Sequence, residues 1–433
     1  VTEEGTLKRT CACGASETQP IEKLIPSEGL KFVSNGDGTC YLDEIGDCTD
    51  KNVIIPAISP EGDTVIEISY CAFQNTDITG VIVPDTVTSI LGSAFNECAS
   101  LTSIKLGKGV TFIDDVAFPY CTSLENIVIP EGVEYIGDYA FSACSALKNV
   151  SIPNSLTYMG ANIFFGCDEL VFNTHDYLNY VGNKTNPNLI LVKVERDDMP
   201  FYNIDPDTKF IYDSAFDSCH GLKEIVIPEG VLGINEYAFS YCEKLTNIEI
   251  PASVTSIKPR AFTSCYSMTD ITVNENSATY KSADGAVYTK DGTVLVCYAT
   301  ANPATTFIIP EGVTEIANSA FYGSSNLIHI TLPESILVIN DSAFSLCYEL
   351  TEIVIPKNVT AINSFAFSHC SSLEKVYIGK NVTIIDSYAF SNNLALTDIY
   401  FEGSEAEWNA IVIEDHNECL ATATVHYNYT PEN

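Results

Sequence analysis

Apolar residues recur along this chain with a period of 23 residues, most clearly in the pattern Ala-Phe-x-x-Cys. The phenylalanines of this pattern fall into three evenly spaced blocks: Phe95, Phe118, Phe141 and Phe164; Phe216, Phe239 and Phe262; and Phe321, Phe344, Phe367 and Phe390. A fixed period of this size predicts a solenoid, in which each repeat packs mainly on its two neighbours.

One repeat, which begins at Leu124, reads LENIVIPEGVEYIGDYAFSACSA. Ile127 and Ile129 are two positions apart, so they share one side of a short strand while the residues between them face the other side. Pro130 cannot donate a hydrogen bond to a strand ladder, and we expect the strand to end there. Stacked repeats would then pair these strands into a parallel sheet.

The second half of the same repeat returns to the core through Val133 and Ile136. Ala140, Phe141 and Cys144 follow at spacings that suit a tight helical turn but are too few for an α-helix. No repeat can bury its apolar face alone, so stacking neighbours must create one long core. The predicted fold class is a mainly β, curved, right-handed solenoid with short helical turns.

Two intervals break the period, because Phe164 and Phe216 are 52 residues apart and Phe262 and Phe321 are 59 apart. The extra residues read as hairpins, YVGNKTNPNLILVKV around an Asn/Pro turn and GAVYTKDGTVLVCY around Asp291-Gly292. We expect both hairpins to project from the solenoid.

The two ends of the chain differ from the repeats and read as caps. Ser404 followed by Glu407 is a capping-box signature for a short helix that carries Trp408, the only tryptophan. The expected organisation is a polar leader or linker at 1–28, a capping hairpin at 29–64, a solenoid at 65–400 with insertions near 168–205 and 274–305, and a C-terminal cap at 401–433.

Composition narrows the class of partner. The chain has 57 Asp and Glu against 21 Lys and Arg, a formal net charge of −36. A field of this sign repels phosphate backbones and anionic lipids, so nucleic acid is not an expected partner. No apolar run approaches the ~18 residues that a membrane-spanning helix needs, so membrane insertion is not expected either.

The sixteen cysteines belong to different settings. Nine lie three residues after a repeat phenylalanine: Cys98, Cys121, Cys144, Cys167, Cys219, Cys242, Cys265, Cys347 and Cys370. Ser324 and Asn393 take this place in two other repeats, so we interpret the nine as buried free thiols that act as small core residues.

Other cysteines leave more than one interpretation open. Cys40 and Cys48 lie in the N-terminal hairpin, where they form either a disulfide or two free thiols. Cys11 and Cys13 have no second ligand pair at a spacing that suits zinc, so no metal site is predicted.

Repeats of the form L-x-x-I-x-I-P-x-x-V-x-x-I-x-x-x-A-F-x-x-C resemble the BspA-like leucine-rich repeat proteins, a class of bacterial surface and secreted proteins. The resemblance covers roughly residues 30–430 and includes SNGDGTCYLDEIGDCTD, LNYVGNKTNPNLILVK and FEGSEAEWNAI. It implies an extracellular or cell-surface location, binding to host or bacterial partners, and no known catalysis. It implies no ligand residues, because the family's shared positions are core positions.

No catalytic or cofactor motif stands out. The six histidines lack metalloprotease spacing, and the sequence contains no nucleophile elbow, phosphate-binding loop or dinucleotide fingerprint. We therefore expect no enzyme activity and no cofactor.

The outward-facing strand positions of the last repeats are the candidate binding surface. The candidate residues are His329, Glu352, Val354, Tyr377, Asp398 and Tyr400. Valine, threonine and tyrosine also favour strands by propensity alone, which is the simpler interpretation of any single residue. As a group, these side chains are apolar and aromatic enough to dock a protein or glycan.

The hypothesis is therefore a secreted or surface-displayed solenoid that works by binding or adhesion. The alternative is a structural protein whose caps or insertions join copies end to end into an extracellular filament, so self-association stays open.

Overall fold

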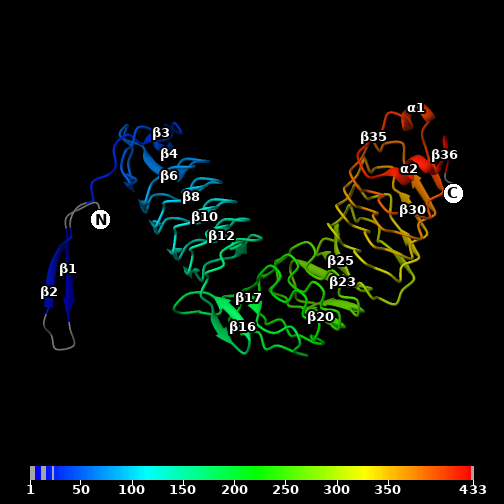
Figure 1. Ribbon diagram of the computed structural model, residues 1–433, viewed down its shortest axis with the longest axis horizontal. Helices are drawn as coiled ribbons and strands as arrows, with labels where there is room; N and C mark the ends of the chain where they lie inside the picture. The colour runs from blue at the N-terminus through cyan, green and yellow to red at the C-terminus, as the bar shows by residue number, and fades with distance from the viewer. Residues whose placement is uncertain (1–4, 11–15, 22–23, 431–433) are drawn as a thin grey trace. The chain divides into compact units, whose positions relative to one another are not determined.

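The computed structural model describes residues 5–10, 16–21 and 24–430, with side chains described from residue 24 to 430. The chain forms two compact units, the first Val1–Phe172 with Val181–Pro187 and the second Asn173–Tyr180 with Asn188–Asn433. Within each unit the chain winds as a solenoid whose rungs stack in sequence order (Figure 1). Each full rung contributes two short extended pieces, and both pair with the neighbouring rungs.

In the first unit, two parallel ladders follow two antiparallel hairpins. The hairpin β1 (Gly5–Thr10) and β2 (Ser16–Ile21) lies within the segment expected to be a polar leader, and Cys11 and Cys13 lie outside the described residues. One sheet contains β3 (Lys31–Ser34), β4 (Thr39–Glu44), β6 (Thr64–Ile68), β8 (Ser89–Ile90), β10 (Phe112–Ile113), β12 (Tyr135–Ile136) and β14 (Tyr158–Met159). The second ladder contains β5 (Asn52–Ile54), β7 (Gly80–Ile82) and β9 (Ser103–Lys105), then β11 (Asn126–Val128) and β13 (Asn149–Ser151).

The second unit repeats this arrangement. The strands that follow Leu in each repeat are β20 (Asn247–Ile250) and β22 (Asp270–Val273), then β26 (Thr306–Ile308), β28 (His329–Thr331), β30 (Glu352–Ile355), β32 (Lys375–Ile378), β34 (Asp398–Phe401) and β36 (Thr424–His426). The other ladder contains β15 (Asn173–His175), β16 (Leu178–Val181), β17 (Ile190–Val194), β18 (Phe210–Ile211), β19 (Gly233–Ile234) and β21 (Ser256–Ile257). It continues with β23 (Tyr280–Ala283), β24 (Ala286–Thr289), β25 (Val294–Tyr298), β27 (Glu315–Ile316) and β29 (Val338–Ile339), then β31 (Ala361–Ile362), β33 (Ile384–Ile385) and β35 (Val412–Ile413).

Alternation along each strand places the core where the sequence predicts it. In β30, Ile353 and Ile355 are buried while Val354 is 49% exposed, and Pro356 follows the strand. The predicted parallel pairing of successive rungs is confirmed, although the ladders divide into several separate sheets. Residues 224–227 form no strand, although they stand one repeat before β20.

A column of stacked phenylalanine rings runs through the core. Phe95 and Phe118 stack with ring centroids 4.8 Å apart and planes 3° apart. Their separation matches the roughly 4.8 Å spacing of neighbouring strands, so each ring rests on the equivalent ring of the next rung. The centroid distance grows to 6.3 Å between Phe141 and Phe164, the pair that precedes the first insertion.

The segment around each phenylalanine differs from the predicted helical turn. Tyr139 and Ala143 have positive φ values of 56° and 55°, in the left-handed region that costs a non-glycine residue roughly 1–2 kcal/mol. Their N–H groups donate across to the next rung, to the carbonyls of Ala161 at 2.9 Å and Phe165 at 2.6 Å. The N–H of Ser142 instead closes a local turn on the Tyr139 carbonyl. Besides the two strand ladders, the turn is therefore a third segment that bonds to the next rung. These inter-rung hydrogen bonds offset the strain of the left-handed residues.

The cysteine positions behave as expected. All nine ladder cysteines are buried free thiols, and Ser324 and Asn393 are buried in the same place. The Cys121 thiol lies 3.3 Å from the Phe95 carbonyl of the preceding rung. Asn393 makes the equivalent contact from its amide nitrogen to the Phe367 carbonyl at 2.9 Å, whereas the buried Ser324 hydroxyl has no partner among the described residues.

Cys40 and Cys48 are both free thiols, and the disulfide that the sequence left open is absent. Cys40 stands near the start of β4, opposite Ser34, whereas Cys48 follows the other end of that strand. The Asp47 N–H bonds the Gly29 carbonyl, so Cys48 lies at the open end of the hairpin and Cys40 lies toward its tip.

The two insertions supply rungs and do not project as predicted. Asp291-Gly292 does form the predicted antiparallel turn between β24 and β25, but β25 then pairs in parallel with β27. Ala286, Leu295 and Tyr298 are buried in the core. In the first insertion β17 likewise pairs in parallel with β18. The inserted hairpins continue the ladder because their apolar faces can be buried only against the neighbouring rungs.

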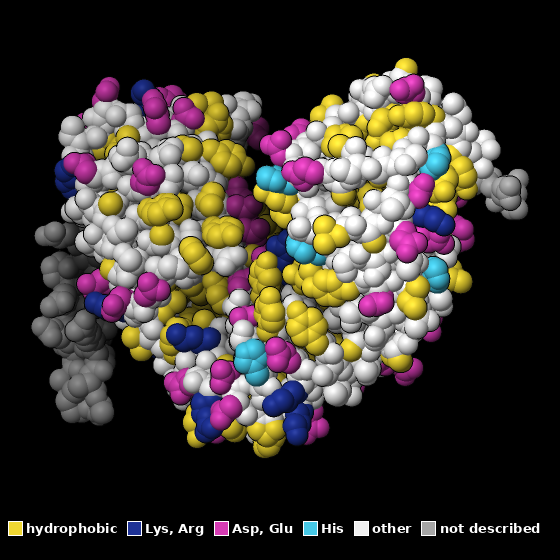
Figure 2. Space-filling model, turned by 45° about the vertical axis from the view of Figure 1, so that its right-hand side comes forward, with side chains coloured by type: hydrophobic (Ala, Val, Ile, Leu, Met, Phe, Trp, Pro, Cys, Tyr) yellow, Lys and Arg dark blue, Asp and Glu magenta, His cyan; other side chains and the backbone are white. Residues whose placement is uncertain are grey.

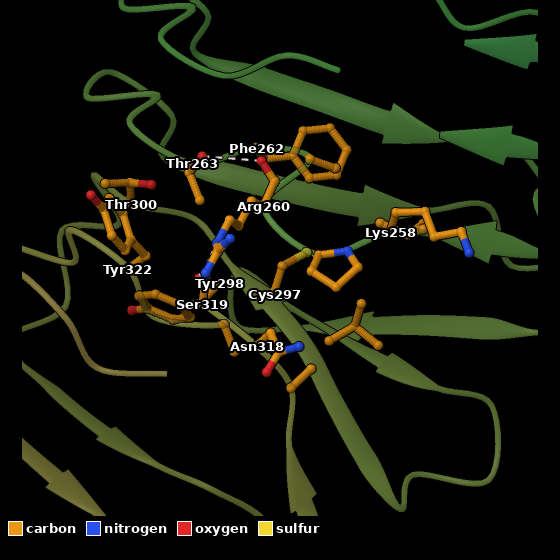
Figure 3. Close-up of a pocket in the computed structure, with 16 residues that line it drawn as sticks. Lys258, Arg260, Phe262, Thr263, Cys297, Tyr298, Thr300, Asn318, Ser319 and Tyr322 are labelled. Atoms are coloured by element: carbon orange, nitrogen blue, oxygen red, sulfur yellow. Dashed lines mark hydrogen bonds between the residues drawn. The ribbon is translucent and has the colours of Figure 1, made fainter. Parts of the chain in front are cut away.

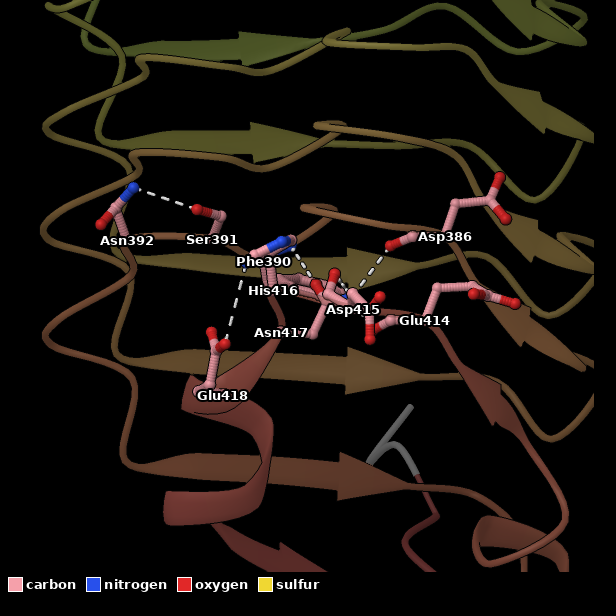
Figure 4. A network of polar contacts seen from close by, with 9 residues as sticks. All are labelled: Asp386, Phe390, Ser391, Asn392, Glu414, Asp415, His416, Asn417 and Glu418. Carbon is pink, nitrogen blue, oxygen red and sulfur yellow. Dashed lines mark hydrogen bonds and ion pairs between the residues drawn. The ribbon is translucent and has the colours of Figure 1, made fainter.

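The C-terminal end is closed by α1 (Glu405–Trp408), α2 (Glu418–Thr422) and a polar network around Asn417 (Figure 4). The predicted capping box is confirmed, and the Trp408 ring packs edge-on against Phe401. The buried Asn417 side chain accepts from the Phe390 N–H at 2.9 Å and donates to the carbonyl of Asp386 at 2.9 Å. Its side-chain oxygen therefore replaces the carbonyl that the next rung offers to the phenylalanine N–H in a regular repeat, as Ala389 does for Phe367.

The ladder thiols should resist modification in the folded protein. Burial raises the pKa of Cys265 and of Cys370 to about 12, so neither is a thiolate at neutral pH. We expect a thiol reagent to label the exposed Cys71 within minutes and the ladder cysteines only after denaturation, as read by peptide mass spectrometry. Comparable labelling of Cys71 and Cys265 under native conditions would contradict the buried column.

Asn417→Ala should loosen the C-terminal rungs. Leaving the buried Phe390 N–H without a partner costs about 2 kcal/mol, whereas the Asp386 carbonyl keeps the Ala389 N–H. Native-state hydrogen exchange should show faster exchange of the Phe390 amide, with little change in rungs far from the cap, because coupling in a solenoid runs between neighbours. Asn409→Ala is the matched control, since Asn409 is exposed and its side chain makes no hydrogen bond with the described residues. Equal effects of the two variants would argue against the network.

The turn at Asp291 should persist into strong acid. One oxygen of its carboxylate accepts from the Thr289 hydroxyl, the Thr293 hydroxyl and the Thr293 N–H, which lowers the pKa of Asp291 from 3.8 to about 2. Because the folded pKa is the lower one, the stabilisation is complete above about pH 4 and is lost as the pH falls through 2. Carboxyl NMR titration should give a midpoint near 2, whereas Thr289→Val with Thr293→Val should raise it. A midpoint near 3.8 in the unchanged chain would rule out these bonds.

Candidate functional site

The predicted strand-face residues lie together in two adjacent columns of one sheet. In the first column Val354, Tyr377 and Tyr400 stand opposite one another on β30, β32 and β34. The second column runs from His329 through Glu352, Lys375 and Asp398 on the same strands and β28. We call the outward-facing side chains of β28, β30, β32, β34 and β36 the C-terminal strand face.

An aromatic cluster forms at the end of this face. The Tyr377 and Tyr400 rings stack at 4.7 Å with planes 13° apart. The imidazole of His426, on β36, stacks on Tyr400 at 4.6 Å, and Tyr429 tilts against Tyr377 and Tyr400 at 5.4 and 5.1 Å. All four rings are only partly buried or exposed, so they present a continuous aromatic surface to solvent.

The sequence alone did not indicate His426 or Tyr429. Asp398 pairs with Thr424, so the last rung is 26 residues long and lacks the Ala-Phe-x-x-Cys marker. The only usable signal was the alternation in Thr424-Val425-His426-Tyr427, which is typical of a final strand.

Charged groups border the aromatic cluster. His426 Nε2 lies 2.7 Å from the Asp398 carboxylate, and this hydrogen bond, with a second from Thr397, lowers the pKa of Asp398. Burial, with the nearby Glu352 carboxylate, raises the pKa of Tyr377, so its hydroxyl is neutral at physiological pH. The rim therefore combines hydroxyl donors with carboxylate acceptors.

This arrangement suits binding. Flat rings with polar groups at their edges stack on a partner and orient it through hydrogen bonds. In the described part of the chain, no three His, Cys, Asp or Glu side chains are grouped so as to hold a metal ion. Within the same ranges, no helix has the length and apolar character needed to cross a bilayer.

The strand side of the second unit also carries a groove that the sequence did not predict. A groove of about 810 Å³ lies where residues 224–227 leave the ladder, and Phe201 and Val226 line it. Val226 is 80% exposed, and carboxylates from Glu224 and Glu249 lie at the same groove. On the face of the molecule that Figure 2 shows, Asp and Glu side chains lie among hydrophobic ones, and Lys and Arg are fewer.

Three comparisons place the chain among known proteins. Six copies of the BspA type leucine-rich repeat region match residues 66–188, 198–284 and 296–417. No curated protein matches.

Solved structures that resemble the chain come from several bacteria. A leucine-rich cell surface protein of Faecalibacterium prausnitzii is 26% identical, over 90% of this chain and 97% of its own, with a TM-score of 0.38. The pneumococcal vaccine antigen PcpA is 17% identical over 94% and 98%, with a TM-score of 0.41. A leucine-rich repeat protein of Eubacterium ventriosum is 19% identical over 94% and 95%, with a TM-score of 0.35.

The matched repeats span most of the chain, and their boundaries fall at the two insertions that interrupt the period. The family indicated by the repeat pattern is therefore confirmed: this chain belongs to the proteins with BspA-type leucine-rich repeats.

Proposed function

We propose that this chain is a secreted or cell-surface binding protein that docks a protein or glycan partner on its C-terminal strand face, without catalysis. The observation that carries the proposal is the stacked Tyr377–Tyr400 pair, which His426 and Tyr429 extend into one solvent-facing cluster. Family membership supports the extracellular location, because the BspA-like resemblance implies surface display or secretion.

Strand propensity alone does not account for this cluster. Tyr377 and Tyr400 sit at strand positions where tyrosine is generally favoured. Tyr429 lies beyond the last strand, and His426 comes from a rung outside the regular repeat, yet both reach the same rings. Four aromatic side chains from repeat and cap thus converge on one surface patch, the pattern expected of an interaction hot spot.

The charged side chains around the cluster limit which classes of partner can bind there. Glu352 and Asp398 border the rings, with Lys375 between them in the same column. A neutral or mildly basic protein surface, or a neutral glycan, meets this rim without like-charge repulsion. Stacking on the rings would supply most of the affinity, and the rim would orient the partner.

Replacing Tyr377 and Tyr400 by serine should weaken binding at least tenfold, because loss of a central aromatic anchor typically costs about 2 kcal/mol or more. Binding of the labelled chain to arrays of glycans and purified secreted proteins would identify partners, and titration of the two chains would compare their affinities. The fold should survive, since neither ring belongs to the buried core.

The matched control is Tyr135→Ser with Tyr158→Ser, which removes an equally well stacked tyrosine pair, 4.5 Å apart, from another sheet. Unchanged affinity in the Tyr377 and Tyr400 variant, with loss on shortening the Asp291-Gly292 hairpin, would move the site to the insertion. Sedimentation of each variant separates lost partner binding from altered self-association.

A further inference from the structure

The turn side of the second unit carries a groove of about 400 Å³, which is built from the Ala-Phe-x-x-Cys turns and not from the strand face. Exposed rings of Tyr241 and Phe365 line it, together with Tyr237 and Tyr322. Small hydroxyl side chains that are themselves buried line it as well: Ser240, Thr263, Ser264, Ser342, Ser345 and Ser368. We call it the Arg260 groove, after its only Lys or Arg lining residue.

The second insertion creates the hollow. Leu295 pairs with Ile316, and the Tyr298 ring takes its place in the ring column 5.1 Å from Phe321. In the inserted rung, the ring residue Tyr298 comes three positions after Leu295. In the next rung, the ring residue Phe321 comes five positions after Ile316. Part of the turn is therefore missing from this rung, and the neighbouring turns flank a gap on the surface.

Arg260 bridges this gap. Its Nε donates to the Ser319 hydroxyl at 3.1 Å, and Nη1 donates to the Tyr237 hydroxyl at 2.9 Å. The guanidinium carbon also lies 5.7 Å from the centre of the Tyr237 ring. Figure 3 shows the side chain beside a small cavity of about 60 Å³, with Tyr322 and Thr300 among its neighbours.

The charge of Arg260 is uncompensated. Among the described residues it forms no ion pair, and two of its five N–H groups are bonded. No Asp or Glu lines the groove, although the chain carries 57 of them. His369, also in the groove, lies 3.0 Å from the Asn392 amide nitrogen at Nε2 and 2.7 Å from the Ser368 hydroxyl at Nδ1.

We propose that the Arg260 groove binds an acidic glycan, with the sugar carboxylate paired to Arg260 and the sugar rings stacked on the tyrosines. A guanidinium with free N–H groups recognises a carboxylate through two parallel hydrogen bonds. Exposed aromatic rings provide flat apolar faces for sugar C–H groups, and the hydroxyls of the floor match sugar hydroxyls. A peptide fits less well, because a floor of small hydroxyls offers no apolar pocket for a side chain.

The first test uses probes that separate these chemistries. Isothermal titration would compare 3′-sialyllactose and a hyaluronan tetrasaccharide with neutral lactose and a hexaglutamate peptide. We expect at least one acidic sugar to bind ten times more tightly than lactose, and which one binds identifies the carboxylate as sialate or uronate. Equal binding of lactose, or tighter binding of hexaglutamate, would overturn the proposal.

Variants then locate the site. Arg260→Gln should weaken the acidic sugar about tenfold and leave lactose unchanged, the effect of losing a charge-assisted hydrogen bond. Tyr241→Ser, at an exposed ring, tests the same groove without removing a bridging side chain. Lys357→Gln removes a positive charge from elsewhere in the unit and should have no effect.

The Tyr377 and Tyr400 double variant should also bind the acidic sugar normally, which separates this site from the C-terminal strand face. Thermal unfolding confirms that each variant is folded. Retained affinity in both Arg260→Gln and Tyr241→Ser would refute the assignment.

Discussion

Every part of this solenoid depends on in-register hydrogen bonding between one rung and the next. The two strand ladders and the N–H groups of the turn all connect one rung to the next. A rung has too little apolar surface to fold alone, so this register decides whether a core exists. Within each regular block the register does not shift, so phenylalanine stacks on phenylalanine, and thiols such as that of Cys121 lie against the phenylalanine carbonyl of the preceding rung.

Exact register also stacks acidic side chains, and the structure turns several of them into acceptors. The Asp115 carboxylate accepts the N–H of Asp138, and Asp138 in turn accepts the N–H of Ala161, both at 2.7 Å. Asp85 accepts the N–H of Lys108 in the same way. Charge-assisted bonds of this kind connect successive rungs. Part of the acidic excess therefore serves the fold, and the net charge alone is a poor guide to the partner.

Surface features arise where the period breaks. A uniform rung would present the same outline at every level, and specificity needs a local difference. The inserted rung at Tyr298 is two residues short between strand and ring, which opens the Arg260 groove. At the C-terminus, a longer rung brings His426 and Tyr429 onto Tyr400. Each proposed binding surface thus lies beside an irregular rung.

Much of this architecture follows from the sequence by itself, because the pattern of a solenoid encodes contacts between equivalent positions. The period predicted the burial of the ladder cysteines, and it accounts for the phenylalanine column and the alignment of Tyr377 with Tyr400. Each of these needs only the rule that a residue meets its counterpart 23 positions later.

Other features were decided only by the tertiary structure. Tyr139 and Ala143 adopt left-handed conformations without the glycine that would announce them, because inter-rung hydrogen bonds impose that geometry. The insertions became rungs because burial against their neighbours outweighed their hairpin pattern. Arg260 meets Ser319 across 59 residues, a contact that no period predicts. Local periodicity determines packing between equivalent positions, whereas the partners at a break depend on which segments the fold brings together.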